Sequence, residues 1–147
     1  MRSFHFPLER VLEFQKKRKK WAEVKQQQAA LARRAAEQAV ALVKEQVKVR
    51  ADFVAEQLRL GNVSASWFAG HQQIEKLSND LKAAEHRARK AAELFSQANK
   101  EREKIAQAVE MLLTLRTKRL HDHKQALSRA EQVLLDELGL RLAGGEQ

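Results

Sequence analysis

The feature that most constrains this chain is a helical apolar pattern with a single clear interruption. After Pro7, no strong helix breaker appears until the segment Leu60-Gly61-Asn62. Proline suits the first position of a helix, because its missing N–H group would have no partner there and its φ is already helical. The sequence therefore predicts two long helices, one on each side of the break.

The break itself carries residues that end one helix and begin another. Gly61 can take a positive φ just past a last helical turn. Ser64 or Ser66 can cap the next helix by accepting a hydrogen bond from a free backbone N–H. We expect one coiled-coil domain over residues 1–147, with boundaries at about 7–60 (helix), 61–65 (loop), 66–138 (helix) and 139–147 (frayed tail).

The two predicted helices differ in their apolar spacing. In the first, steps of three, four and four residues repeat, which predicts a nearly straight helix: Ala29, Ala32, Ala36, Val40, Val43, Val47, Ala51, Val54 and Leu58. In the second, strict steps of three and four predict a coiled coil: Ile74, Leu77, Leu81, Ala84, Ala88, Ala91, Phe95, Ala98, Ile105, Val109 and Leu112. Leu113, Leu120, Leu127 and Leu134 continue it with a shifted phase.

Two long helices joined by a short loop are expected to fold back on each other. In an antiparallel pair, facing residue numbers then sum to roughly 127, with the loop at the centre of the pairing. This predicts four facing pairs: Val54 with Ile74, Val43 with Ala84, Leu31 with Phe95, and Trp21 with Ile105. The fold class expected is all-α, an antiparallel coiled-coil hairpin.

The predicted helices are unequal in length, roughly 80 Å against roughly 108 Å at 1.5 Å per residue. The second helix should therefore extend past the first at its C-terminal end, from about residue 120. The apolar residues of this overhang would have no partner within the chain: Leu120, Leu127, Val133, Leu134 and Leu138.

Composition agrees with long helices rather than with a compact core. The chain has 147 residues, of which 44% are hydrophobic and 32% charged, but only 5% are aromatic, and there is no cysteine. This mixture is typical of coiled coils. Neither a secretory signal nor an apolar run long enough to span a bilayer is visible, so we expect a cytoplasmic protein.

The excess of positive over negative side chains is concentrated in the first 60 residues of the chain. The net charge is +9, and residues 1–60 hold 14 Lys and Arg against 7 Asp and Glu. Five consecutive cations, Lys16, Lys17, Arg18, Lys19 and Lys20, form what we call the basic run. It is either a solvated helix face or a docking patch for an acidic protein surface, phosphates or anionic lipid. Phe4 and Phe6, just before it, either cover the end of the hairpin or anchor a partner.

No catalytic constellation is visible, so we expect no enzyme, no metal and no cofactor. The five glycines form no phosphate-binding loop. His121 and His123 are two residues apart, and such side chains point in nearly opposite directions from a helix.

The motifs at both ends of the first helix resemble the flagellar type III export protein family FliJ and its injectisome stalk relatives. The stretch "FHFPLERVLEFQKKRKKWAE" is similar to the family's opening pattern of two phenylalanines, apolar residues, then a basic run. Around the loop, the family's Gly-x-x-Ser-x-x-Trp pattern, with an Ile and a Leu after it, matches at Gly61, Ser64, Trp67, Ile74 and Leu77.

The resemblance implies a two-helix stalk that inserts into the export ATPase ring, links it to the membrane export gate and meets substrate chaperones. Such a protein would be associated with the inner-membrane export apparatus. The ATPase-binding end would comprise Phe4, Phe6, the basic run, Leu120, Leu127 and Leu134. Gate contact near the loop would fall on Gln46, Arg50, Gln73 and Leu77, where family members often carry aromatic residues.

Two other classes stay open from the residues alone. A nucleic-acid-binding coiled coil would use the basic run on phosphates and the leucine repeat for dimerisation. A purely structural coiled coil would form filaments.

Overall fold

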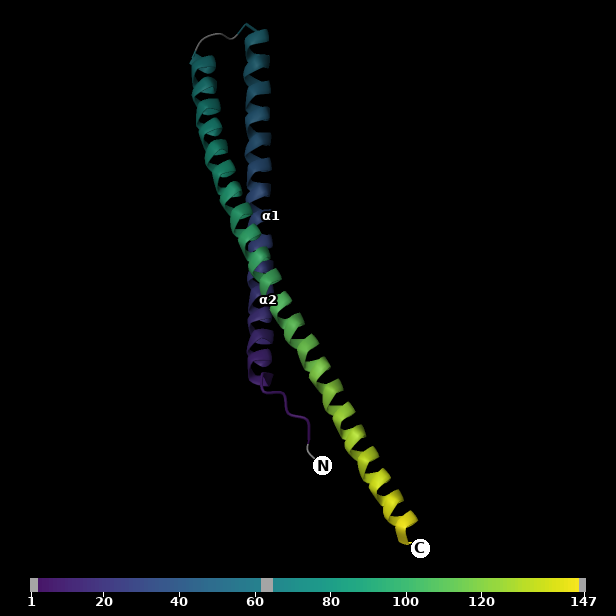
Figure 1. Cartoon of the computed structure of the whole chain (residues 1–147). Helices are drawn as coiled ribbons and strands as arrows, with labels where there is room; N and C mark the ends of the chain where they lie inside the picture. The colour runs from purple at the N-terminus through teal and green to yellow at the C-terminus, as the bar shows by residue number, and fades with distance from the viewer. Residues whose placement is uncertain (1–2, 62–64, 146–147) are drawn as a thin grey trace. The chain divides into compact units, whose positions relative to one another are not determined.

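The computed structural model describes residues 3–61 and 65–145, and the described residues form two helices and no strand. Helix α1 is Glu9–Arg59, with 51 residues, and helix α2 is Ala65–Gly145, with 81 residues (Figure 1). The chain is an all-α antiparallel hairpin with a longer second helix, which confirms the predicted fold class.

Helix α1 begins two residues later than predicted, because Pro7 belongs to the turn before it. The backbone N–H of Glu9 donates to the carbonyl of Phe6 at 3.1 Å, and that of Leu12 donates to the carbonyl of Leu8 at 2.9 Å. Proline is favoured at the second position of such a turn, since its fixed φ suits it. Pro7 therefore directs the preceding segment rather than the helix itself.

The predicted stop at Gly61 is confirmed. Gly61 has a φ of 83°, and its N–H donates to the carbonyl of Leu58 at 3.1 Å. A side chain at this φ would be strained, so glycine ends the helix without steric cost. Of the two predicted caps, Ser64 lies outside the described residues, and Ser66 is already inside α2.

Helix α2 extends to Gly145 instead of ending near residue 138. One glycine within a helix costs only about 1 kcal/mol relative to alanine, and leucine is a strong helix former. The helix therefore continues past Gly139, favoured by the helix propensity of Leu138, Leu140 and Leu142. The predicted frayed tail is helical as far as the described residues go.

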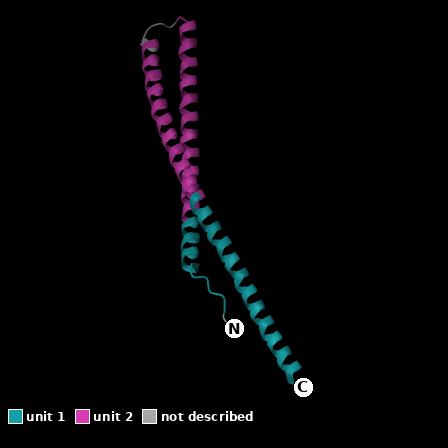
Figure 2. Ribbon diagram, in the orientation of Figure 1, with its two compact units in different colours: residues 1–20, 104–147 teal, residues 21–103 magenta. Residues whose placement is uncertain are grey.

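The chain packs as two compact units, coloured separately in Figure 2. Unit 1 comprises Met1–Lys20 and Lys104–Gln147, and unit 2 comprises Trp21–Glu103. Each unit contains a segment of α1 and a segment of α2.

Polar contacts establish the register of unit 2. Gln26 Nε2 donates to Asn99 Oδ1 at 2.7 Å, and Lys25 Nζ lies 3.6 Å from Glu101 Oε2. In both pairs the residue numbers add up to nearly the predicted sum. The antiparallel pairing is therefore the one that the loop position predicts.

The inward face of α1 in unit 2 matches the predicted one at six of nine positions and differs at three. Ala32, Ala51 and Leu58 are exposed. Steps of three and four residues connect the half-buried and buried side chains instead: Ala22, Gln26, Ala29, Arg33, Ala36, Val40, Val43, Val47, Arg50, Val54 and Gln57. Both helices thus follow a heptad spacing, and α1 places polar residues in it.

Two of the predicted facing pairs are wrong for the same reason. Leu31 is 64% exposed, and the Arg33 guanidinium lies over the Phe95 ring at 5.1 Å in its place. Trp21 is 66% exposed, while the adjacent Ala22 is buried. A long arginine stem can cover an apolar ring while its charged head reaches water, so Arg33 replaces a leucine in the seam.

The predicted inward face of α2 is confirmed in unit 2. Ala84 and Ala98 are buried, and the other predicted positions from Ile74 to Phe95 are half-buried. Arg102 continues the row, and its Nε is buried without a hydrogen-bond partner. Near the loop, a Cβ built on Gly70 would lie 2.6 Å from Val54 Cγ2. The helices are close there because Gly70 has no side chain.

Unit 1 holds the best-packed apolar cluster of the described chain. Phe6, Leu12 and Val109 are buried together, and Leu12 is fully buried. Half-buried side chains surround them: Phe4, Leu8, Leu112 and Leu115. The segment before α1 therefore folds onto α2 and supplies core side chains.

The unpartnered part of α2 begins later than the predicted residue 120. Leu120, His123 and Leu127 are half-buried, whereas every described side chain from 128 to 145 is exposed. The segment before α1, through Phe4, extends the packed region of unit 1 further along α2 than the helix length alone predicts. We call residues 128–145 the overhang.

Candidate interaction surfaces

The basic run lies on α1 in unit 1 and is only partly free. Lys16, Lys17 and Lys20 are exposed, whereas Arg18 and Lys19 are half-buried. Cationic side chains commonly lay their methylene stems along apolar surface and keep the charge in water. Three of the five cations are thus fully available to a partner, and the run goes around the helix as expected from adjacent residues.

The two phenylalanines before α1 have different environments. Phe6 is 3% exposed, so it covers the core of unit 1 and has no free surface for a partner. Phe4 is half-buried, with its ring centroid 5.6 Å from that of His123. The Arg116 guanidinium lies 5.9 Å from the Phe4 centroid. The interpretation of Phe6 as a partner anchor is therefore wrong for this structure.

An ion pair fixes the start of α1 beside this aromatic cluster. Arg116 Nε donates to Glu9 Oε2 at 2.9 Å. Both side chains are about 40% exposed, at 40% for Arg116 and 41% for Glu9. Partly exposed pairs contribute at most about 1 kcal/mol, so this contact positions Phe4 and Glu9 more than it stabilises them.

The overhang presents the largest set of exposed apolar side chains in unit 1. Leu134 is 58% exposed, so it is the freest of the three leucines predicted to bind a partner; Leu120 and Leu127 are half-buried. Further exposed residues on the overhang are Val133, Leu135, Leu138, Leu140 and Leu142. Large exposed apolar surfaces commonly mark interaction sites.

A groove near the loop brings together three of the four predicted gate residues. Gln46, Arg50 and Leu77 line an open hollow of about 540 Å³. Gln73 is exposed and does not line it. The other lining residues are Leu42, Glu45, Val49 and Phe53. The predicted residues therefore surround an apolar stripe that is not among the surfaces predicted from the sequence.

The spacing of the stripe's residues in the sequence is enough to predict it. Leu42, Val49 and Phe53 are 62%, 58% and 51% exposed, and they recur at helical spacing on a face away from the seam. The Arg50 guanidinium lies 5.8 Å from the Phe53 ring centroid. Three large apolar residues at steps of seven and four, outside the heptad row, indicate a second apolar face.

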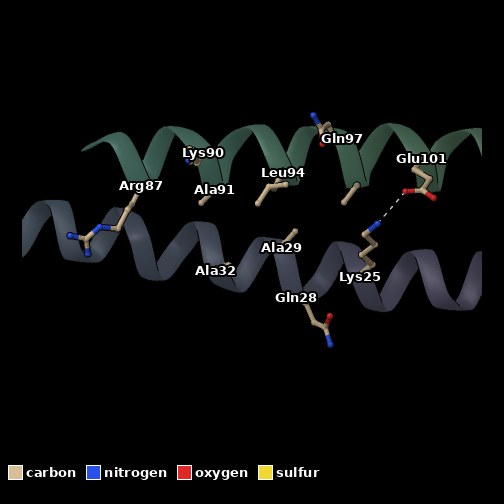
Figure 3. A pocket seen from close by; sticks show the side chains of 11 residues that line it. Lys25, Gln28, Ala29, Ala32, Arg87, Lys90, Ala91, Leu94, Gln97 and Glu101 are labelled. Carbon is tan, nitrogen blue, oxygen red and sulfur yellow. Dashed lines mark ion pairs between the residues drawn. The ribbon is translucent and has the colours of Figure 1, made fainter. Parts of the chain in front are cut away.

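A second groove lies along the seam of unit 2. It has about 510 Å³ and is lined by small residues, including Ala29, Ala91 and Ala98 (Figure 3). Leu94 projects into it and is 62% exposed. The lining cations are Lys25, Arg87 and Lys90, and Lys25 is paired with Glu101. The groove exists because alanines leave the seam thin.

Two histidines of α2, His121 and His123, have ordinary surroundings. His123 packs against Phe4, and His121 lies at the surface beside Leu113 and Thr117. Among residues 3–61 and 65–145, no three His, Cys, Asp or Glu side chains are grouped closely enough to hold a metal ion.

Comparison with known proteins gives no assignment of function. No protein-family model, curated protein or solved structure matches the chain. Neither described helix contains a segment apolar enough, over enough residues, to cross a membrane.

Proposed function

We propose that this chain is a non-enzymatic, stalk-like component of the bacterial flagellar type III protein export apparatus. It binds the export ATPase ring, links it to the membrane export gate and meets substrate chaperones. The motifs at Phe4–Phe6 and around Gly61 and Trp67 support this proposal, and so does the two-helix hairpin. In this role the chain works in the cytoplasm, at the inner-membrane export apparatus, and requires no cofactor.

The observation that best supports the proposal is the exposure of the overhang. Its large apolar side chains are all exposed, and no described part of the chain covers them. An isolated helix gains little from propensity alone, so a helix of this composition is stabilised by a partner that buries its apolar face. The basic run belongs to the same unit. Together they provide an apolar contact and an electrostatic one for the ATPase.

The groove around Gln46, Arg50 and Leu77 is the proposed gate contact. Its apolar floor, formed by residues such as Val49 and Phe53, supplies the buried area that a protein partner needs. Polar residues at its rim supply specificity. The two proposed contacts lie in different units, so they can be tested by separate variants.

The proposal is tested by titrating the purified chain into the purified flagellar export ATPase in a calorimeter. The variant Leu134→Gln/Leu138→Gln should weaken binding by about 2–4 kcal/mol, since each buried leucine contributes about 1.5–3 and glutamine retains part of it. Met111→Gln is the control, because Met111 is 73% exposed in unit 1 but lies before the overhang. Absence of binding by the unmodified chain would refute the assignment.

The nucleic-acid alternative makes a different prediction for the same protein. Binding of a random duplex through phosphate contacts falls steeply with salt concentration. Tight binding to random duplex DNA at physiological salt, together with no binding to the ATPase, would favour that alternative.

A further inference from the structure

The end of unit 2 at the loop carries large apolar side chains that point into solvent. Leu58 and Leu60, where α1 ends, are 40% and 63% exposed; Trp67 and Phe68, in the first turn of α2, are 40% and 60% exposed. We call these four residues the loop tip. Figure 1 shows α1 ending and α2 beginning at this same end of the unit. Four such residues within eleven positions form a concentrated apolar surface.

The loop tip also lies in the longest stretch of the chain without a carboxylate side chain. Between Glu56 and Glu75 there is no Asp or Glu, although the whole chain has 19. The same stretch of the sequence contains one Lys or Arg, Arg59, which is paired with Glu56 at 2.8 Å. The tip is therefore nearly neutral as well as apolar. Desolvating it costs little, because few charges have to leave water.

The residue types at the tip are those that favour the interface of a bilayer. Tryptophan is enriched there because its ring is apolar while its indole N–H can donate to a polar group. The Trp67 ring is stacked on the His71 ring, with centroids 5.6 Å apart and planes at 9°. This stacking gives the indole a fixed, partly polar setting on the first turns of α2.

The shape of this surface argues for lipid rather than for a folded protein. The two grooves of unit 2 described above are lined by residues within 25–53 and 77–101, so the loop tip lines neither of them. The tip consists of projecting side chains at a helix-to-helix connection. Projecting apolar groups need a surface that yields around them, and acyl chains do so.

We propose that the loop tip inserts into the headgroup–acyl boundary of a lipid bilayer. The inference goes beyond the proposed function, in which the chain reaches the membrane only through partner proteins. Insertion of a nearly neutral tip depends on apolar burial, so it requires no anionic lipid and persists in salt. Binding through the basic run would instead require anionic lipid and would be lost in salt.

The two tryptophans of the chain distinguish these modes, because Trp21 directly follows the basic run and Trp67 belongs to the tip. The experiment uses Trp21→Phe, which leaves Trp67 alone, and Trp67→Phe, which leaves Trp21 alone. Each is mixed with phosphatidylcholine vesicles, with and without brominated acyl chains, at low and high salt. The Trp67 emission should shift to the blue and be quenched by the brominated lipid at both salt concentrations, while the Trp21 emission stays unchanged.

A second pair of variants tests the apolar contribution. Leu60→Ser/Phe68→Ser should reduce the vesicle partition coefficient by about tenfold or more, since two large apolar side chains lose most of their burial. Leu31→Ser/Met111→Ser is the matched control, because these side chains are as exposed but lie outside the tip. Circular dichroism checks that both variants stay helical. If Trp67 is not quenched on phosphatidylcholine vesicles, or if both double variants lose partitioning equally, the proposal is wrong.

Discussion

The side-chain amide of Gln26 donates a hydrogen bond to Asn99 Oδ1, 2.7 Å away across the seam of unit 2. Both residues are half-buried. An apolar seam with a regular heptad spacing can slip by one heptad at little cost, whereas a polar pair is satisfied in only one register. The pair therefore selects the register more than it adds stability.

Removing this pair should show a measurable coupling. In a double-mutant cycle with Gln26→Ala and Asn99→Ala, we expect a coupling free energy of about 0.5–1.5 kcal/mol from urea unfolding. Arg34→Ala combined with Asn99→Ala is the control cycle. Arg34 is exposed, and the hydrogen-bond partner of Asn99 is Gln26. Equal couplings in the two cycles would mean that the hydrogen bond contributes nothing specific.

Truncation of two phenylalanines of unit 1, Phe6 and Phe14, should destabilise the protein to very different extents. Phe6→Ala removes a side chain that is 3% exposed in the core of unit 1 and should destabilise that unit by about 3 kcal/mol or more. Phe14→Ala removes one that is 55% exposed and should change the free energy of unfolding by about 0.5 kcal/mol or less. Urea unfolding followed by circular dichroism gives both values. Similar losses for the two variants would contradict the core position of Phe6.

Replacing glycine by alanine should have opposite effects on stability at two helical positions of α2. At Gly70, the added Cβ would meet Val54 Cγ2 at 2.6 Å, so Gly70→Ala should destabilise unit 2 by about 1–3 kcal/mol. At Gly139, no atom beyond the adjacent residues and the backbone of its own helix turn lies within 4 Å of the added Cβ, and Gly139→Ala should stabilise the overhang helix by up to about 1 kcal/mol. Thermal unfolding tests the first change, and amide exchange within residues 128–145 tests the second.

A compensating change separates steric crowding from other causes at Gly70. Val54→Ala removes the atom that the new Cβ would meet, so the double variant Gly70→Ala/Val54→Ala should be no less stable than Val54→Ala alone. A further loss in the double variant would show that Gly70 is required for a reason other than close approach.

Hydrogen exchange should distinguish the overhang from the packed part of α2. Backbone amides of residues 128–145 have no tertiary packing and should exchange fast in the free chain, whereas those between 98 and 116 should be protected. Mixing the chain with the export ATPase should slow exchange across the overhang. Strong protection in the dilute free chain would mean that these residues are covered by the chain itself or by another copy.

The exposed part of the basic run should control association with an acidic partner. Lys16→Gln/Lys17→Gln/Lys20→Gln should slow association with the ATPase and flatten its dependence on salt, because these charges steer the encounter. Lys48→Gln/Lys76→Gln/Lys82→Gln removes the same charge from exposed positions in unit 2. Stopped-flow association rates compare the two triple variants. Equal slowing would indicate a general effect of net charge.

Much of the fold follows from the sequence, because hydrophobic periodicity and a single glycine carry most of the information. The row from Ile74 to Phe95 and the stop at Gly61 are predicted correctly, since apolar spacing and positive φ are local properties. The inward face of α1 is predicted only in part, because Arg33 and Arg50 occupy seam positions there. An arginine reads as a surface residue, yet its stem can pack in a seam when a partner such as Phe95 accepts its guanidinium.

The candidate surfaces are less predictable than the fold. The exposure of Leu134 follows from helix lengths, but the burial of Phe6 depends on how the segment before α1 folds onto α2. The stripe formed by Leu42, Val49 and Phe53 can be recognised only after the seam of α1 has been placed correctly. When the inward-facing residues of a helix are predicted wrongly, its outward-facing residues are predicted wrongly as well.

The thin seam of unit 2 has a mechanical consequence. Among the described residues of unit 2, the buried hydrophobic side chains are those of three alanines, Ala22, Ala84 and Ala98, so each layer buries little apolar area and contributes little on its own. A force that peels the two helices apart is resisted by one layer at a time, whereas a force that slides them along each other loads every layer together. The unit should therefore tolerate shear far better than peeling, and a partner that grips only one helix could open it progressively at low force.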